Sequence, residues 1–137
     1  MTDQELIDIA FDALTKAYAP YSDHMVGAAL LSKDGRVFTG CNIENASYTP
    51  TVCAERVAFF KAVSEGVRDF DKIAVVGGRG GVAHKYLAPC GVCRQVMSEF
   101  CGDDFQIVMA MSRDNYIVRT LDEMLPARFK PEDLDKN

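Results

Sequence analysis

Three cysteines and one glutamate stand in two short segments whose spacing suits a metal centre. Cys90 and Cys93 are three residues apart, so on one helix they share a face and can hold the same ion. Cys53 lies well upstream and would add a third thiolate, which leaves the fourth position of a tetrahedral zinc ion open, as in catalytic sites. Glu55 follows two residues later, where a carboxylate can move protons beside that open position. The residues therefore predict a catalytic Zn²⁺ ion, one per chain.

Two other interpretations of the cysteines stay open. A Cys-x-x-Cys pair can be a redox centre, but such a centre needs neither a third cysteine nor a glutamate nearby. The pair can also be half of a four-cysteine structural zinc site, with Cys41 or Cys101 as the fourth ligand. Neither of these two belongs to a second close pair, and free cysteines of this kind usually serve as small apolar filler.

The elements that must position these residues are two helices. Thr49-Pro50 is a helix-start signal for a helix running to Gly66, and Pro89 opens another that runs to Gly102. Each cysteine segment is therefore expected at a helix start, where the backbone N–H groups and the helix dipole stabilise thiolates.

The predicted metal centre carries an excess of negative charge. Three thiolates on one divalent zinc leave a net charge of about −1, which makes the metal a poorer Lewis acid. A neighbouring cation would restore some of that power. Arg56, beside Glu55, is the natural candidate, and Arg94, beside Cys93, is a second.

Composition predicts one soluble domain spanning residues 1–137. The chain has 48% hydrophobic and 26% charged residues, which are ordinary globular values. No apolar run reaches transmembrane length, and the acidic start from Met1 to Glu5 does not fit a signal peptide, so we expect a cytoplasmic protein with no membrane partner. A formal net charge of −5 argues against nucleic acid as a partner, because phosphate binding needs a basic patch. A small uncharged ligand fits better.

The order of the remaining elements predicts an α/β fold. Strand pairs alternate with helices, which indicates a three-layer α/β/α sandwich with a mixed sheet of about five strands and helices on both faces. The glycine-rich stretch 77–81 lacks the Gly-Lys-Ser/Thr ending of a phosphate loop, so we expect a flexible connector. The expected elements are a helix over 4–18, strands over 26–31, 37–41, 72–76, 106–111 and 116–120, and a helical turn over 121–125.

Several motifs together resemble the cytidine deaminase family, in its short, homotetrameric, three-cysteine form. The strongest are the Cys-Ala-Glu-Arg run at 53–56 and the Pro-Cys-Gly-Val-Cys run at 89–93, a pattern typical of zinc-dependent nucleobase deaminases. Runs at 19–22, 26–30 and 40–46 extend the resemblance over most of the chain. It implies hydrolysis of cytidine and deoxycytidine to uridine and deoxyuridine plus ammonia, in pyrimidine salvage. Zinc-activated hydroxide would attack C4 of the ring while Glu55 carries protons.

The resemblance also implies the residues that bind the substrate. Asn42 and Glu44 match the family's ribose-binding pair, and backbone groups of Ala46 and Ala54 would read the pyrimidine edge. Further positions match residues that reach a neighbouring subunit's site, so a complete site would require a homotetramer; these positions are Tyr48 and Phe129.

One position departs from the family pattern. Where the family usually has a phenylalanine that packs on the ligand, this chain has His24. Histidine can still stack, but its ring is smaller, polar and able to change charge near neutral pH. The substitution therefore predicts either a different aromatic partner or a different substrate choice or pH response.

Two alternative functions remain. The protein could deaminate another aminated heterocycle, such as a nucleoside antibiotic, but the ribose pair Asn42 and Glu44 is present. It could instead be a non-catalytic zinc module for interactions, although such a module has no use for Glu55 beside an open coordination position.

Overall fold

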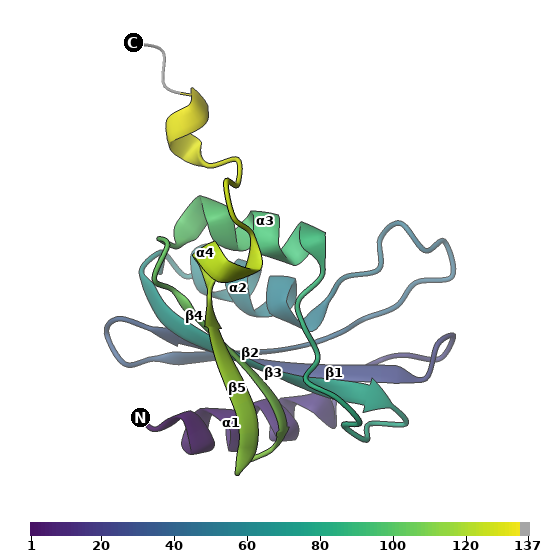
Figure 1. Ribbon diagram of the computed structural model, residues 1–137. Helices are drawn as coiled ribbons and strands as arrows, with labels where there is room; N and C mark the ends of the chain where they lie inside the picture. The colour runs from purple at the N-terminus through teal and green to yellow at the C-terminus, as the bar shows by residue number, and fades with distance from the viewer. Residues whose placement is uncertain (135–137) are drawn as a thin grey trace.

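The computed structural model describes residues 1–134, which form a mixed five-stranded sheet between two layers of helices (Figure 1). In chain order the elements are α1 (Asp3–Leu14), β1 (His24–Ser32), β2 (Val37–Cys41), α2 (Ala54–Ser64), β3 (Phe70–Arg79), α3 (Gly91–Phe100), β4 (Gln106–Ser112), β5 (Asn115–Thr120), α4 (Leu121–Met124) and the 3₁₀ turn η1 (Pro131–Leu134). The predicted three-layer α/β fold with about five strands is confirmed.

The strand order is β2-β1-β3-β4-β5. Three of the four neighbouring pairs are antiparallel, and β3 and β4 form the one parallel pair. A parallel pair needs a crossover connection, and here α3 supplies it. The crossover places the start of α3 beside the start of α2 on the same face of the sheet (Figure 1).

Alternating residues of the strands supply two separate cores. On β1, Ala28 and Leu30 face α2 and α3, whereas Ala29 and Leu31 face α1. This two-residue period is what a sheet covered on both sides requires. Figure 1 shows α1 below the sheet and α2, α3 and α4 above it, so the two cysteine-bearing helices share one layer.

The start of α2 differs from the prediction. The helix begins at Ala54 rather than at Thr49-Pro50. Val52 exchanges two backbone hydrogen bonds of 3.0 Å with Ile43, which holds the chain extended until Cys53. A tertiary pairing therefore overrides the local Thr-Pro signal, and Cys53 becomes the N-cap residue.

The glycine-rich stretch also differs from the prediction. Gly77 and Gly78 belong to β3 and pair with Val26 and Met25, so they are not a flexible connector. A Cβ at Gly77 would lie 2.5 Å from the carbonyl oxygen of Met25, so glycine is needed for close packing. Within residues 1–134, no helix has the length and apolar character to cross a membrane.

Candidate metal centre and catalytic pocket

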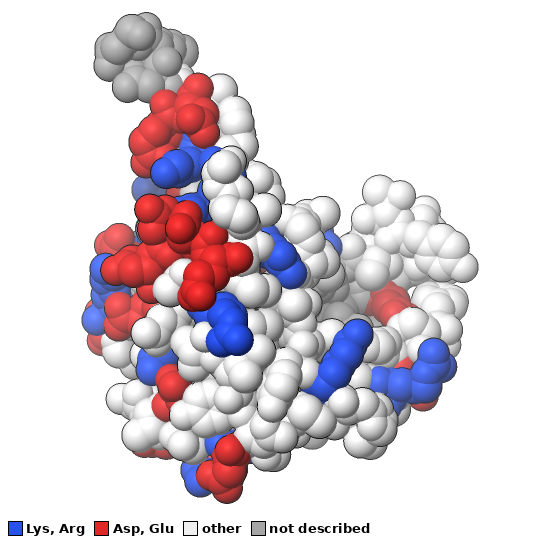
Figure 2. All heavy atoms as spheres, in the orientation of Figure 1, with Lys and Arg blue, Asp and Glu red and all other residues white. Residues whose placement is uncertain are grey.

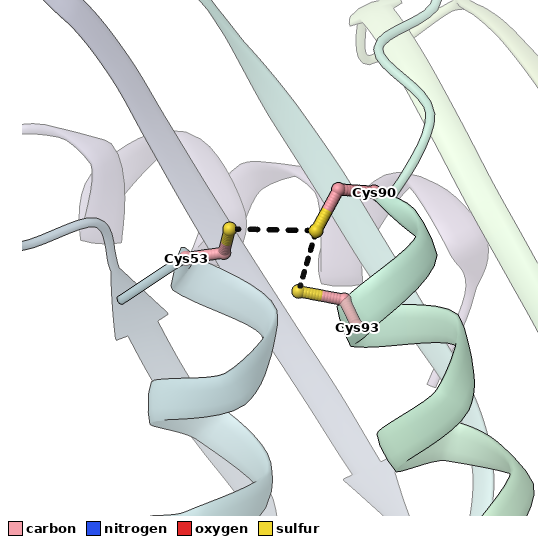
Figure 3. A group of neighbouring side chains, drawn as sticks. All are labelled: Cys53, Cys90 and Cys93. Atoms are coloured by element: carbon pink, nitrogen blue, oxygen red, sulfur yellow. Dashed lines mark hydrogen bonds between the residues drawn. The ribbon is translucent and has the colours of Figure 1, made fainter. Parts of the chain in front are cut away.

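The three predicted ligands converge where α2 and α3 begin. Cys53 is the N-cap residue of α2, Cys90 is the N-cap residue of α3, and Cys93 lies in the first turn of α3. The Sγ atoms of Cys53 and Cys90 are 3.7 Å apart, and those of Cys90 and Cys93 are 3.5 Å apart (Figure 3). All three sulfurs lie within 4.8 Å of one another. Cys41 and Cys101 are not part of this group, which weighs against a four-cysteine structural site.

A glycine on β2 allows α2 to begin close to the sheet. A Cβ on Gly40 would lie 2.1 Å from the carbonyl oxygen of Ala54 and 2.8 Å from the amide nitrogen of Ala58. The first turn of α2 can therefore rest directly on the strand backbone. This contact fixes the height of Cys53 and Glu55 above the sheet.

The spacing of the sulfurs fits a tetrahedral zinc ion. Zn–S bonds of about 2.3 Å at tetrahedral angles place two sulfurs about 3.8 Å apart. The separations of 3.7 and 3.5 Å are close to that value. Thiolates are soft ligands that select zinc over magnesium or calcium. The donor set Cys53, Cys90 and Cys93 therefore fits Zn²⁺ and leaves one coordination position for a non-protein ligand.

The local charges prepare Cys53 to act as a thiolate. A hydrogen bond from the Cys93 thiol and another from Arg56 lower the pKa of Cys53 to about 5. The pKa of the Cys93 thiol is raised, because it gives its hydrogen to Cys53 and lies buried. These shifts favour the thiolate form of Cys53, and the N-termini of both helices stabilise negative charge at this place.

Arg56 is the cation that reaches the sulfurs. Its Nη2 atom donates to Cys53 Sγ at 3.5 Å, and this contact raises the pKa of the guanidinium. Arg94, the second candidate, directs its donors elsewhere: Nε reaches the carbonyl oxygen of Pro89 at 2.8 Å, and Nη1 reaches that of Met124 at 2.6 Å. The sequence suggested both arginines as cations near the ligands, but the side chain of Arg94 donates to backbone carbonyl oxygens instead.

Glu55 lies in the first turn of α2 with 4% of its surface exposed. It lines a cavity of about 240 Å³ together with Cys53 and Cys90. Burial raises the pKa of Glu55 to about 7, and the negative charge of Cys53 adds to the rise. A carboxyl group with such a pKa can both accept and release a proton near neutral pH, which suits a proton carrier.

Three of the seven predicted substrate residues also line this cavity. They are His24, Asn42 and Glu44. Asn42 uses its amide on the backbone of β1: Oδ1 accepts from the Val26 N–H at 2.9 Å, and Nδ2 donates to the His24 carbonyl at 2.7 Å. These two bonds fix the orientation of the amide and leave the second Nδ2 hydrogen for another acceptor.

Glu44 is held by the loop before β1. Its Oε1 atom accepts from the backbone N–H groups of Tyr21 at 3.0 Å and Ser22 at 3.2 Å, and its Oε2 atom accepts from the Ser22 hydroxyl. These bonds, of which the Ser22 hydroxyl contributes most, lower the pKa of Glu44. The carboxylate is therefore anionic and oriented, with acceptor capacity left on Oε2.

The other predicted substrate residues lie outside this cavity. Ala54 is the first residue of α2 and is fully buried. Ala46 is exposed. Tyr48 is 75% exposed and lines a neighbouring cavity of about 340 Å³. Phe129 is 56% exposed on the C-terminal segment.

Sequence reasoning missed several residues of the pocket. Ser22 and Thr51 line both cavities, and Leu87 and Ala88 form the wall between β3 and α3. Ser22 belongs to the run at 19–22 that resembles the family, so the sequence could have predicted it as a pocket residue. Nothing in the local sequence marks Leu87 or Ala88, because they reach the site only through the path of the loop after β3.

The view in Figure 2 shows where charge gathers on one face. Carboxylates cluster over α4 and the C-terminal segment, while lysine and arginine side chains are scattered singly. The exposed acids of these elements include Asp122, Glu123, Glu132 and Asp133. This face therefore has no continuous basic strip.

Residues 1–110 match the family model described as the cytidine and deoxycytidylate deaminase zinc-binding region. The chain belongs to this family. A cytidine deaminase from Sporosarcina psychrophila is 46% identical over 134 residues, which cover 98% of this chain and 96% of that protein. The fold also matches the crystal structure of cytidine deaminase from Burkholderia pseudomallei, with a TM-score of 0.87 and 46% identity over 94% of this chain and 100% of that one.

Another relative is a deaminase named for a different substrate. Blasticidin-S deaminase from Bacillus cereus is 32% identical over 131 residues, covering 93% of this chain and 91% of that protein. The cysteine centre and the family match together establish zinc as the cofactor of this deaminase.

Proposed function

We propose that this protein catalyses the zinc-dependent hydrolytic deamination of free cytidine and deoxycytidine. The products are uridine and deoxyuridine plus ammonia, which makes the protein a hydrolase of the C–N bond in a cyclic amidine. The observation that carries the proposal is the meeting of Glu55 with Cys53 and Cys90 on one cavity wall. A structural zinc site has no use for a buried carboxyl group beside its ligands.

Zinc, when bound, lowers the pKa of a coordinated water toward ~7 and so supplies a nucleophile for C4 of the cytosine ring. Glu55 takes the proton that this water gives up and delivers it to ring N3. It then carries the remaining proton of the oxygen now bonded to C4 to the amino group, which leaves as ammonia when the C4–N bond breaks and the C4 carbonyl forms. A pKa of about 7 allows Glu55 to alternate between these two roles.

Asn42 and Glu44 bind the ribose of the nucleoside. The free Nδ2 hydrogen of Asn42 and the remaining acceptor position on Glu44 Oε2 offer one donor and one acceptor to ribose hydroxyls. The backbone N–H groups at the start of a helix have no partner within it, so that of Ala54 can read the pyrimidine edge. A backbone group of Ala46 also binds the pyrimidine edge. His24 lines the cavity and packs against the pyrimidine ring.

The same proposal includes a homotetramer in which neighbouring subunits complete each site. Tyr48 and Phe129 are large aromatic residues with 75% and 56% of their surfaces exposed, so both are accessible to a neighbouring subunit. A role in pyrimidine salvage belongs to this proposal. A cytoplasmic location belongs to it as well, because three cysteine ligands must remain reduced to bind zinc. The substrate is a free nucleoside rather than nucleic acid, since the formal net charge of −5 disfavours binding of a phosphate backbone.

The decisive experiment follows the loss of cytidine absorbance on mixing with the purified protein. We expect turnover with zinc, none after treatment with a chelator, and recovery when zinc is restored. Glu55→Gln should bind zinc normally and lose at least about 10²-fold in turnover, the usual contribution of a positioned proton carrier. Full turnover by the zinc-loaded Glu55→Gln protein would rule out the mechanism.

The similarity to blasticidin-S deaminase favours one alternative substrate class, the aminated nucleoside antibiotics. Assaying cytidine, deoxycytidine and blasticidin S side by side separates the two. Glu44→Gln should weaken binding of cytidine, because the carboxylate that faces the ribose is lost. An enzyme that turns over blasticidin S faster than cytidine would favour the alternative.

A further inference from the structure

The side chain of Arg94 spans two backbone carbonyls from different parts of the chain. Nε donates to the Pro89 carbonyl at 2.8 Å, and Nη1 donates to the Met124 carbonyl at 2.6 Å. The residue is partly buried, and no ion pair within residues 1–134 involves it. Its guanidinium is therefore committed to backbone oxygens, next to a helix that carries two zinc ligands.

The first of these carbonyls directly precedes the ligand Cys90. Pro89 is fully buried, and a buried carbonyl without a donor is costly. The proline ring already fixes φ at this residue, so the bond to its oxygen also restrains the peptide plane that leads into Cys90. The backbone N–H of Arg94 donates to the Cys90 carbonyl at 3.0 Å. One residue therefore holds the carbonyl groups on both sides of the ligand's Cα.

The second carbonyl belongs to the C-terminal part of the chain. Met124 ends α4, where helix carbonyls have no partner within the helix and favour a cationic donor. The next residue of α3, Gln95, donates from Nε2 to the Phe129 carbonyl at 2.8 Å. Two consecutive residues of α3 thus tie the segment after α4 to the helix start that carries Cys90 and Cys93.

We propose that Arg94 is a positioning residue, which holds Cys90 in its ligand geometry and couples the C-terminal segment to the zinc centre. The role depends on the planar fork of the guanidinium, whose nitrogens reach two oxygens in different directions. A lysine ammonium keeps the positive charge but concentrates its donors at one point, so it cannot reproduce both bonds. A role in geometry and a role in charge therefore predict opposite results for Arg94→Lys.

The test measures zinc affinity rather than turnover. Arg94→Met, Arg94→Lys and wild type are stripped of metal, and Zn²⁺ alone is titrated in competition with a chromogenic chelator. We expect both variants to bind Zn²⁺ about 10- to 100-fold more weakly, the range typical when a residue that orients a ligand is lost. Cobalt(II) added in place of zinc should show altered thiolate absorption bands in both variants.

Arg113→Met is the matched control, because Arg113 is an exposed arginine paired with Asp8 on the far side of the sheet. Its zinc affinity should equal that of wild type. Wild-type affinity in Arg94→Met, or recovery of affinity in Arg94→Lys, would overturn the proposal. If circular dichroism shows that Arg94→Met does not fold, Arg94→Lys alone decides, and affinity within about twofold of wild type refutes the role.

This inference rests on the zinc centre of the proposed function, but the two can fail separately. Absence of cytidine turnover by wild type that binds zinc tightly would refute the proposed substrate and leave Arg94 unaffected. Normal turnover by wild type with unchanged zinc affinity in both Arg94 variants would refute only the positioning role.

Discussion

Replacing Glu55 with glutamine should make the metal-free protein more stable at neutral pH relative to wild type, and this gain should disappear in acid. Glu55 has 4% of its surface exposed, and its pKa rises from the usual 4.5 to about 7. Glutamine has nearly the same shape and cannot ionise. The comparison therefore isolates the free energy of placing a carboxylate in this pocket.

The sign follows from the protons bound in each state. Below pH 4.5 the carboxyl group is protonated both folded and unfolded, so ionisation contributes nothing. Between 4.5 and about 7 the folded protein keeps a proton that the unfolded chain has lost, so rising pH favours unfolding. Above about 7 the full penalty is present, and it amounts to roughly 3 kcal/mol at about 1.36 kcal/mol per pKa unit.

The assay is urea unfolding of both metal-free proteins, kept reduced, at several pH values from about 4.5 to 8. The stability of Glu55→Gln minus that of wild type should rise across this range by about 3 kcal/mol. Taking the difference removes a constant effect of the new amide and most of the titration of Cys53. A difference that does not change with pH would refute the idea that burial keeps Glu55 protonated.

Three further predictions concern the surroundings of the site. Arg56→Gln should lower zinc affinity or turnover about 10- to 100-fold; unchanged zinc content and unchanged turnover would remove Arg56 as charge balancer. His24→Phe should change KM for cytidine and deoxycytidine, because a larger and apolar ring would replace the imidazole that lines the pocket; unchanged KM values would make the departure inconsequential. Gly40→Ala should destabilise the fold by about 1–3 kcal/mol or more in thermal unfolding, since its Cβ would meet the Ala54 carbonyl at 2.1 Å. Gly102→Ala, whose Cβ has only an ordinary contact of 3.5 Å, is the control, and equal melting temperatures would contradict the packing argument.

Local sequence determined the chemistry of this protein before any fold was known. Thiol spacing of three residues, a third cysteine and a carboxyl group two residues beyond it are properties of the covalent chain. The same is true of the short apolar runs that predict the strands. The structure confirms the five strands and brings the three cysteines together, whereas the role of Glu55 stays a prediction.

Long-range pairing decided where the elements begin. The pairing of Val52 with Ile43 delays α2 until Ala54, and the pairing of Gly77 with Val26 turns a supposed connector into strand. Val52 and Ile43 are nine residues apart and Gly77 and Val26 are 51 apart, so in both cases the partner lies beyond the reach of local propensity. The sequence therefore located the helix that carries Cys53 but misplaced its start.

Only the tertiary structure divided the charged residues near the zinc centre into different roles. Arg56 and Arg94 each lie beside a functional residue in sequence, yet Arg56 reaches a sulfur while Arg94 bridges two carbonyls. Glu55 and Glu44 are both pocket carboxyl groups, but burial raises the pKa of the first and hydrogen bonds lower that of the second. The sequence determines which chemical groups are present. Their roles depend on the direction and solvent exposure of each side chain, and both of these depend on how the whole chain packs.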